Sequence, residues 1–406
     1  MTYRILPLAL ALLATESYAA ELHGSLDLRA GHSNAGRSFL DGGMGKTRYD
    51  TAAPALSIGQ AVLRAEFDVL DTVSAGVELS GDDRHHNVVD MREAWFVWSP
   101  VPAGAWKMRV KAGYFFPPTS VEIDYEGLGW TPTRTISSAA INSWIGEELR
   151  TNGVEWSARR MGRHVDAPYD VGVVAAVFTG NDPAGTLLAW RGWSISDRIA
   201  GRNEALQLAD LPVYRADGAI PRQSRTIHPF REIDGRPGYY VGTNLRSGPG
   251  LELAALHYDN RANPLAVQGG QYGWRTRFHH ASLAWRPAPG WELLAQAMRG
   301  DTLMGANGVA LDFRAWYALA SRRIGRATLA LRYDRFSTSE HDILPDDPNN
   351  ERGHALALAY RLPLADGWTL MFESLFVRSD RSARDLIGEP QHQAERSLLA
   401  SLRWQF

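Results

Sequence analysis

The segment 398–406 alternates between two kinds of side chain at successive positions. One row is apolar and the other mostly polar: Leu398, Ala400, Leu402, Trp404 and Phe406 against Leu399, Ser401, Arg403 and Gln405. Because a strand turns successive side chains to opposite faces, this segment predicts a strand with one apolar face. Such a strand suits a bilayer-spanning barrel, in which one face meets lipid and the other a wet interior.

The same two-residue period recurs along the chain in segments of about ten to twelve residues. Predicted strands are 22–30, 57–69, 74–81, 88–98, 106–116, 149–159, 169–180, 238–247, 250–259, 274–286, 291–300, 311–322, 326–336, 353–362, 368–378 and 396–406. The even number, 16, is what a bacterial single-chain barrel requires, and 14 or 18 strands remain alternatives. The sequence therefore predicts an all-β fold, a transmembrane antiparallel β-barrel.

The connections between these segments alternate in length. Short, turn-like connections fall at 70–73, 99–105, 287–290, 323–325 and 363–367, whereas long ones fall at 31–56, 82–87, 117–148, 181–237, 260–273, 301–310, 337–352 and 379–395. Short periplasmic turns and long extracellular loops are typical of outer-membrane barrels. The segment 181–237 is predicted to be a surface loop without a core of its own, which could fold over the mouth of the barrel, with a short helix at 196–209.

Residues 1–19 have the pattern of a secretory signal peptide. A basic start precedes the apolar run 5–14, and Ser17 and Ala19 place small residues at a cleavage site. The apolar run is too short to anchor the chain in a membrane. We therefore expect residues 20–406 to form a single outer-membrane barrel domain.

Composition excludes several classes of protein. The chain has no cysteine, so it contains neither disulfides nor thiolate metal sites. Its formal charge of −2 argues against nucleic acid as a partner. The longest apolar run after the signal peptide, 171–178, is too short for a transmembrane helix, which leaves strands as the spanning elements.

Aromatic residues cluster near the ends of the predicted strands and mostly share a face with aliphatic ones. They include Trp95, Trp156, Tyr239, Trp285, Trp291, Tyr317, Tyr333, Tyr360 and Trp368. Tyr and Trp favour the boundary between headgroups and hydrocarbon, so the set predicts aromatic belts.

If the aliphatic residues face lipid, their alternates line the interior of the barrel. Lys107, Arg109 and Lys111 then form one inward row, and Arg64 and Arg92 fall on the same inner face. The loop 117–148 supplies acids, which are Glu122, Asp124 and Glu126. Acids on an infolded loop opposite bases on the wall would create a transverse field that favours small polar solutes. Alternatively, these charges only hydrate the lumen and pair with one another.

The preference for anions or cations stays open. The other bases expected to point inward are Arg246, Arg286, Arg314, Arg332 and Arg361. The acids expected on the same face are Asp27, Glu66, Glu78, Asp90, Glu155, Glu252, Asp334 and Glu373. Neither sign predominates.

The run 91–98 (MREAWFVW), a short turn and 109–122 (RVKAGYFFPPTSVE) resemble the equivalent hairpin of the phosphate- and polyphosphate-selective porins. A strand ending at Phe406 also resembles the closing strand of bacterial outer-membrane barrels, where the terminal Phe serves as the assembly signal. This resemblance implies a trimeric porin of 16 strands, with Arg109 and Lys111 as lumen bases and the barrel-assembly machinery as a partner that reads Phe406. The chain departs from that family in lacking a dense run of lysines elsewhere inside.

Enzymatic, metal-binding and cofactor-binding interpretations have little support. His85–His86 and His279–His280 are adjacent pairs, and neighbours on a strand point to opposite faces, so neither pair is a natural chelate. The Gly81–Asp82–Asp83 segment fits a turn better than a calcium site. We therefore expect no enzyme activity, no metal and no cofactor.

The leading hypothesis is a passive porin in the outer membrane of a Gram-negative bacterium, for small hydrophilic solutes or anions. Its expected surroundings are outer-membrane lipids and two further copies of the chain. The alternatives are a substrate-specific or export channel for an organic anion or acidic polymer, and a plugged structural barrel.

Overall fold

A computed structural model describes residues 20–84, 87–124, 128–248, 250–342, 344 and 346–406. The predicted signal peptide, 1–19, lies outside the described residues. The wall consists of β1 (Ala20–Ser33), β2 (Leu56–Leu70), β3 (Val73–Gly81), β4 (Asp90–Trp98), β5 (Trp106–Phe115), β8 (Thr151–Arg160), β9 (Tyr169–Thr179), β12 (Gly238–Ser247), β13 (Leu251–Asp259), β16 (Arg275–Trp285), β17 (Trp291–Met304), β18 (Val309–Ile324), β19 (Ala327–Glu340), β20 (Glu351–Pro363), β21 (Trp368–Arg381) and β22 (His392–Gln405).

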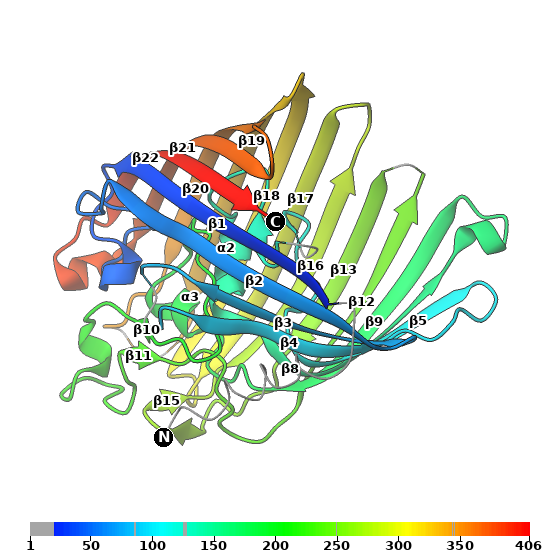
Figure 1. The fold of residues 1–406 in the computed structure, drawn as a ribbon. Helices are drawn as coiled ribbons and strands as arrows, with labels where there is room; N and C mark the ends of the chain where they lie inside the picture. Colours follow the sequence, from blue (N-terminus) through cyan, green and yellow to red (C-terminus); the bar gives the residue numbers. More distant parts are fainter. Residues whose placement is uncertain (1–19, 85–86, 125–127, 249, 343, 345) are drawn as a thin grey trace.

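These strands form one closed antiparallel barrel in sequence order. The ring closes where β1 pairs with β22, from Ser25 opposite Gln405 to Ser33 opposite Ser397. Figure 1 shows this seam as the blue strand beside the red one. The prediction of a 16-stranded antiparallel barrel is therefore confirmed, because every backbone edge is paired within the ring.

Burial alternates along β18 as the two-residue period requires. On β18, Phe313, Ala315 and Tyr317 are buried, whereas Arg314 and Trp316 between them are exposed on the outer face. The prediction that Arg314 points inward was wrong. The sequence could not show this, since an arginine at the outer rim of a barrel keeps the same spacing as one in the lumen.

Long loops and short turns occupy opposite rims of the barrel, as predicted. One difference concerns the predicted loop 301–310, which shrinks to 305–308 because β17 and β18 continue beyond their predicted ends. At the rim with short turns, tryptophans lie exposed on the outer wall, among them Trp98, Trp285, Trp291 and Trp368. Trp95, in contrast, is 6% exposed and turns inward, while its neighbour Phe96 is 61% exposed.

The long loops carry the remaining elements, except η2, which lies in the turn between β8 and β9. The helices are α2 (Ala140–Glu148), α3 (Thr186–Trp190) and the short 3₁₀ helices η1 (Phe39–Asp41), η2 (Gly162–His164), η3 (Pro212–Tyr214) and η4 (Ser382–Ile387). Three two-stranded pairs complete the set: β6 (Ile123–Asp124) with β7 (Thr131–Pro132), β10 (Leu206–Gln207) with β11 (Thr226–Ile227), and β14 (Val267–Gln268) with β15 (Gln271–Tyr272). None of the described helices is both long and apolar enough to cross a membrane.

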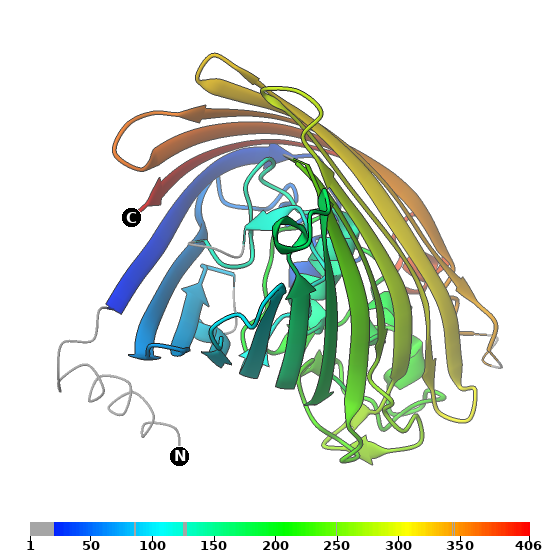
Figure 2. The same cartoon turned by 90° about the vertical axis from the view of Figure 1, so that its right-hand side faces the viewer.

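The loop 181–237 packs inside the barrel, contrary to the prediction of a surface loop without a core. Leu187, Trp190 and Trp193 are at most 1% exposed and belong to the largest apolar cluster. The segment 196–209 contains no helix; the loop has α3 before this segment and the short η3 after it. Figure 2 shows cyan and green segments of the long loops within the ring of strands.

Candidate functional site

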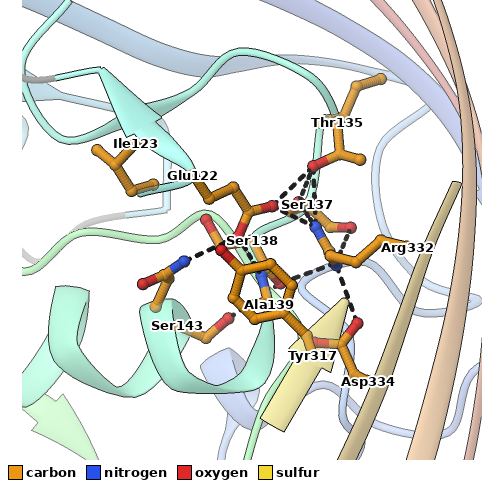
Figure 3. A network of polar contacts seen from close by, with 12 residues as sticks. Glu122, Ile123, Thr135, Ser137, Ser138, Ala139, Ser143, Tyr317, Arg332 and Asp334 are labelled. Atoms are coloured by element: carbon orange, nitrogen blue, oxygen red, sulfur yellow. Dashed lines mark hydrogen bonds and ion pairs between the residues drawn. The ribbon is translucent and has the colours of Figure 1, made fainter. Parts of the chain in front are cut away.

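Arg332 on β19 connects the barrel wall to the loop 117–148. It makes a wall contact with Asp334 at 2.9 Å and reaches Glu122 on the loop at 2.6 Å. Its guanidinium also donates to Thr135 and to the carbonyl oxygens of Ser137 and Ser138. Figure 3 shows these bonds converging on one guanidinium. Because Arg332 and Glu122 are fully buried, this pair attaches the loop rigidly to the wall and leaves no free charge in the lumen.

Further bonds attach the same loop to neighbouring strands. Glu373 on β21 accepts hydrogen bonds from the backbone N–H groups of Ile136 and Ser137. Gln296 on β17 accepts from the backbone of Val121 at 3.2 Å and from Tyr317 Oη at 2.7 Å. These bonds hold the loop against the wall from β17 to β21.

The loop continues across the seam of the barrel. Arg403 on β22 donates to the Pro132 carbonyl at 2.9 Å, and Thr131 bonds to Gln60 on β2 at 3.0 Å. At Gly129, φ is +61°, and a Cβ there would lie 2.0 Å from Glu78 on β3. The loop therefore lines the half of the wall that runs from β17 through the seam to β3. The other half, from β5 to β13, remains outside these contacts.

The predicted base row lies on that other half. Lys107 and Arg109 are exposed, and in the described part of the chain no carboxylate lies within 4 Å of either. Lys111 is more enclosed: its Nζ lies 3.8 Å from Glu93 and 4.5 Å from the centre of the Phe115 ring. The three bases share the inner face, because Lys111 is opposite Val97 in the register, and Val97 is buried.

The other predicted bases make ion pairs on the wall. Arg64 lies 2.6 Å from Glu66 and 3.7 Å from Glu78. Arg92 is 1% exposed and lies 3.6 Å from Glu78. A β-bulge opposite Glu78 places both Arg92 and Glu93 on the buried side. Arg92 therefore does not face open solvent within the barrel.

The three predicted loop acids differ in what can be said of them. Glu122 contacts a wall base, but this base is Arg332 and not the row on β5. Asp124 belongs to β6, and its side chain lies outside the described part. Glu126 lies outside the described residues altogether.

An apolar layer of loop side chains lies inside the barrel toward the rim with the long loops, and sequence reasoning missed it. Trp144 on α2 packs against Phe278 and Phe313 of the wall, with ring centres 5.7 and 5.3 Å apart. Trp193 lies 6.1 Å from Trp144 in the same layer. The available signal was the concentration of tryptophan in two loops that a solvated surface would not require.

Buried charges hold the loops of this layer together. Glu147 on α2 binds Arg191 at 2.5 Å and Arg198 at 3.1 Å. The neighbouring Glu148 accepts hydrogen bonds from Trp144 and from the backbone of Gly185 and Leu187. Burial raises the pKa of Glu148 to about 7, and the hydrogen bonds limit this rise. The contact between α2 and α3 therefore contains a group that titrates near neutral pH.

Asp182, Glu232 and Asp234 are the acids that come together with metal-binding geometry in the described part of the chain. Their ligand oxygens lie within 4.8 Å of one another. The Asp182 carboxylate already accepts hydrogen bonds from the backbone N–H groups of Ile233 and Asp234. Burial, with the charges of Glu232 and Asp234, raises the pKa of Asp182 to about 7. Backbone donors thus already occupy one oxygen of the Asp182 carboxylate.

Comparison with known proteins places the fold among outer-membrane channels. No family model matches the sequence, and no curated protein matches it. Among solved structures, the outer membrane channel DcaP of Acinetobacter baumannii aligns with a TM-score of 0.59 at 9% identity, covering 96% of this chain and 98% of that one. The trimer form of OmpT, an outer membrane protein of Vibrio cholerae, aligns with a TM-score of 0.53 at 9% identity over 96% and 100% of the two chains. An anion-selective porin from Comamonas acidovorans aligns with a TM-score of 0.50 at 14% identity over 96% and 100%. At these identities the likeness concerns the fold.

Proposed function

We propose that this protein is a passive outer-membrane channel for small hydrophilic solutes, with a preference for anions. The observation that carries the proposal is the exposed basic wall on the half of the barrel that the loop 117–148 does not line. On β5 to β13 the inward-facing charges are the bases Lys107, Arg109, Lys111, Arg159 and Arg246 and the acids Glu155, Asp170 and Glu252. Such a wall lowers the energy of an anion and raises that of a cation.

The exposed charges near the rim with short turns favour a channel over a plugged structural barrel. Lys107, Arg109 and Arg246 are exposed although they point to the inside of the ring. Charged side chains stay exposed inside a barrel only where water reaches them. The loops thus leave an aqueous vestibule below the apolar layer.

The apolar layer itself favours a narrow, substrate-selective channel over general diffusion. A constriction crossed by fully buried tryptophans admits few solutes and conducts weakly. Phosphate is one anion that would suit the basic vestibule, as would a small organic carboxylate. The phosphate-selective family itself stays a hypothesis that rests on the hairpin 91–122.

The location and assembly belong to the same proposal. Tryptophans around one rim, such as Trp98 and Trp291, support residence in an outer membrane. A homotrimer is supported by the trimer form named for the Vibrio cholerae protein. Recognition of Phe406 by the assembly machinery is a further part of the proposal.

Recording from the purified protein in a planar bilayer tests the function. In a salt gradient we expect a small single-channel current whose reversal potential indicates anion preference. Chloride, phosphate and an organic anion are compared in turn. A cation-selective current would refute the anion preference, and the absence of current at all voltages would favour the plugged barrel.

A further inference from the structure

Four bases form one row on the outer wall of the barrel, where lipid is expected. His257 on β13 is opposite His279 on β16, His279 is opposite Arg299 on β17, and Arg299 is opposite Arg314 on β18. All four are on the outward face, because the alternate positions, such as Tyr258 and Phe313, are buried inside. The rings of His257 and His279 are 4.6 Å apart.

Like charges placed directly opposite each other on a sheet are destabilising, so this row calls for a counter-charge. Arg314 donates one hydrogen bond to Ser337 at 3.1 Å. Within the described residues, no carboxylate lies within 4 Å of Arg299 or Arg314. By contrast, Arg277 one step higher on β16 is paired with Asp301 at 2.9 Å. Arg299 and Arg314 therefore remain available to an anion from outside.

An apolar groove of 820 Å³ lies directly beside this row. Small residues line it below the bases, namely Gly242, Ala255, Ala281 and Ala297, and Trp316 forms one side. Larger side chains on the neighbouring strands, such as Val241 at 48% exposed, stand beside these small ones. The four bases of the row belong to the lining of this groove, so an anionic head and an apolar chain can be bound side by side.

The height of the row matches the headgroup boundary of the outer leaflet. From Trp291 in the lower aromatic belt to Arg299 on the same strand, eight residues rise about 26 Å along the strand. At a tilt of about 40° this is about 20 Å across the membrane, close to the height of a barrel's apolar band of about 25 Å. On β18 the order from the middle outward is Trp316 and then Arg314, so the base lies just beyond the aromatic ring.

In the described residues the outward charge lies on one side of the barrel, where the exposed Arg335, Arg378 and Arg396 continue it beyond β18. In the upper half of β2 to β12, the outward positions that the structure describes are uncharged, and exposed apolar residues such as Leu56, Val154 and Val177 occupy them. A general need for solvation at the rim would distribute charge around the whole ring. The one-sided row points to a ligand that is met on that side only.

We propose that the row His257–His279–Arg299–Arg314 binds the phosphate group of an outer-leaflet lipid whose acyl chains lie in the adjacent groove. Arg299 and Arg314 supply charge-assisted hydrogen bonds to the phosphate, and the alanine floor contacts the hydrocarbon. The ligand class is a phosphorylated lipid. Binding of this kind is independent of the channel, because the site lies on the opposite face of the wall from the lumen.

Native mass spectrometry of the full-length protein in detergent tests the proposal, with diphosphoryl lipid A as the probe. We expect the double variant R299Q/R314Q to bind it about 30-fold more weakly, which corresponds to about 2 kcal/mol. R322Q/R323Q serves as the matched control, since it removes two arginines from the opposite end of β18, and its affinity should be unchanged. A heat-shift gel confirms that each barrel is folded.

A second variant tests the groove separately from the charges. A281F fills the floor from the outer surface without entering the barrel interior, so it should weaken lipid A binding while all four bases remain. Dephosphorylated lipid A should bind no better to the wild type than to R299Q/R314Q. Equal affinity of wild type and R299Q/R314Q for the diphosphoryl lipid would overturn the proposal. Tight binding of phosphate-free lipid would also overturn it, because the groove would then bind by apolar contact only. A change of oligomeric state in R299Q/R314Q would overturn it as well, because the row would then be a protein interface.

Discussion

Replacing Arg332 with Gln should release the loop 117–148 from the wall and increase the current through the barrel. Arg332 makes six hydrogen bonds, and five of them reach the loop, at Glu122, Thr135, Ser137 twice and Ser138. In R332Q the carboxylates of Glu122 and Asp334 stay buried without their cation. Removing one partner of a buried ion pair costs about 3–5 kcal/mol. Since about 1.4 kcal/mol is a factor of ten, the population of detached loop rises at least about 100-fold.

The bonds that remain limit the effect to this loop. Glu373 still holds Ile136 and Ser137, and Gln296 still holds Val121, so we expect transient detachment and a barrel that stays folded. Single-channel recording should therefore show brief openings to a higher conductance level than the wild type reaches. The double variant E122Q/R332Q, which leaves neither charge of the pair behind, should show fewer such openings than R332Q.

Arg361 provides the control, since it points inward from the neighbouring strand β20 and no carboxylate of the described chain lies within 4 Å of it. R361Q removes the same charge from the same wall without a bond to the loop, so its conductance levels should match the wild type. If R332Q and R361Q give the same current traces, the loop is not held by the Arg332 anchor and the reasoning fails.

Three further predictions follow from the lumen and the apolar layer. The triple variant K107Q/R109Q/K111Q should move the reversal potential toward cation selectivity, and an unchanged potential would remove these bases from the conducting path. The contact between α2 and α3 should be most stable at acidic pH and weaken as pH rises from about 4.5 through about 7, because the folded protein holds a proton on Glu148 that the unfolded chain releases earlier. The protection factors of the amides of 140–148 against hydrogen exchange, compared between pH 5 and 8, measure this stability. E148Q should flatten its pH dependence, and equal protection factors at both pH values would contradict the prediction. The Trp190 side chain is fully buried between Tyr214 and Trp274, so W190A should destabilise the apolar layer by about 3–5 kcal/mol and raise the conductance. An unaltered conductance would show that the layer does not limit the current.

The wall of the barrel was predictable because hydrocarbon and water impose a strict two-residue period on every strand. Each of the predicted strands has a counterpart in the ring, with small differences at the ends. The interior was less predictable, since the loops carry no period. Arg332 could be placed on the inner face from its spacing, yet its partner Glu122 lies 210 positions away in the sequence. Nothing in the local sequence specifies such a pair.

The role of single charges was the weakest part of the sequence reasoning. Spacing placed Lys107 and Arg314 equally well inside the barrel, and only one of them is there. The error arises near the rim, where the lipid-facing side of a strand passes into headgroups and tolerates arginine. The loop 181–237 was misjudged for a related reason. Its many charged residues suggested solvent, but several of them, such as Arg191 and Arg198, are neutralised by Glu147 inside the apolar layer.

The pairing of β1 with β22 has a consequence for biogenesis. Until these two strands pair, every partly formed sheet has two edge strands with unpaired backbone N–H and C=O groups, and each edge can pair with a strand of a neighbouring molecule. The contacts that remove this hazard, such as Asp27 with Ser401 at 2.6 Å and with Arg403 at 2.8 Å, join residues separated by almost the whole polypeptide. Closure of the ring is thus an all-or-none final step, and a chaperone that covers both edge strands until then would protect the growing sheet from aggregation.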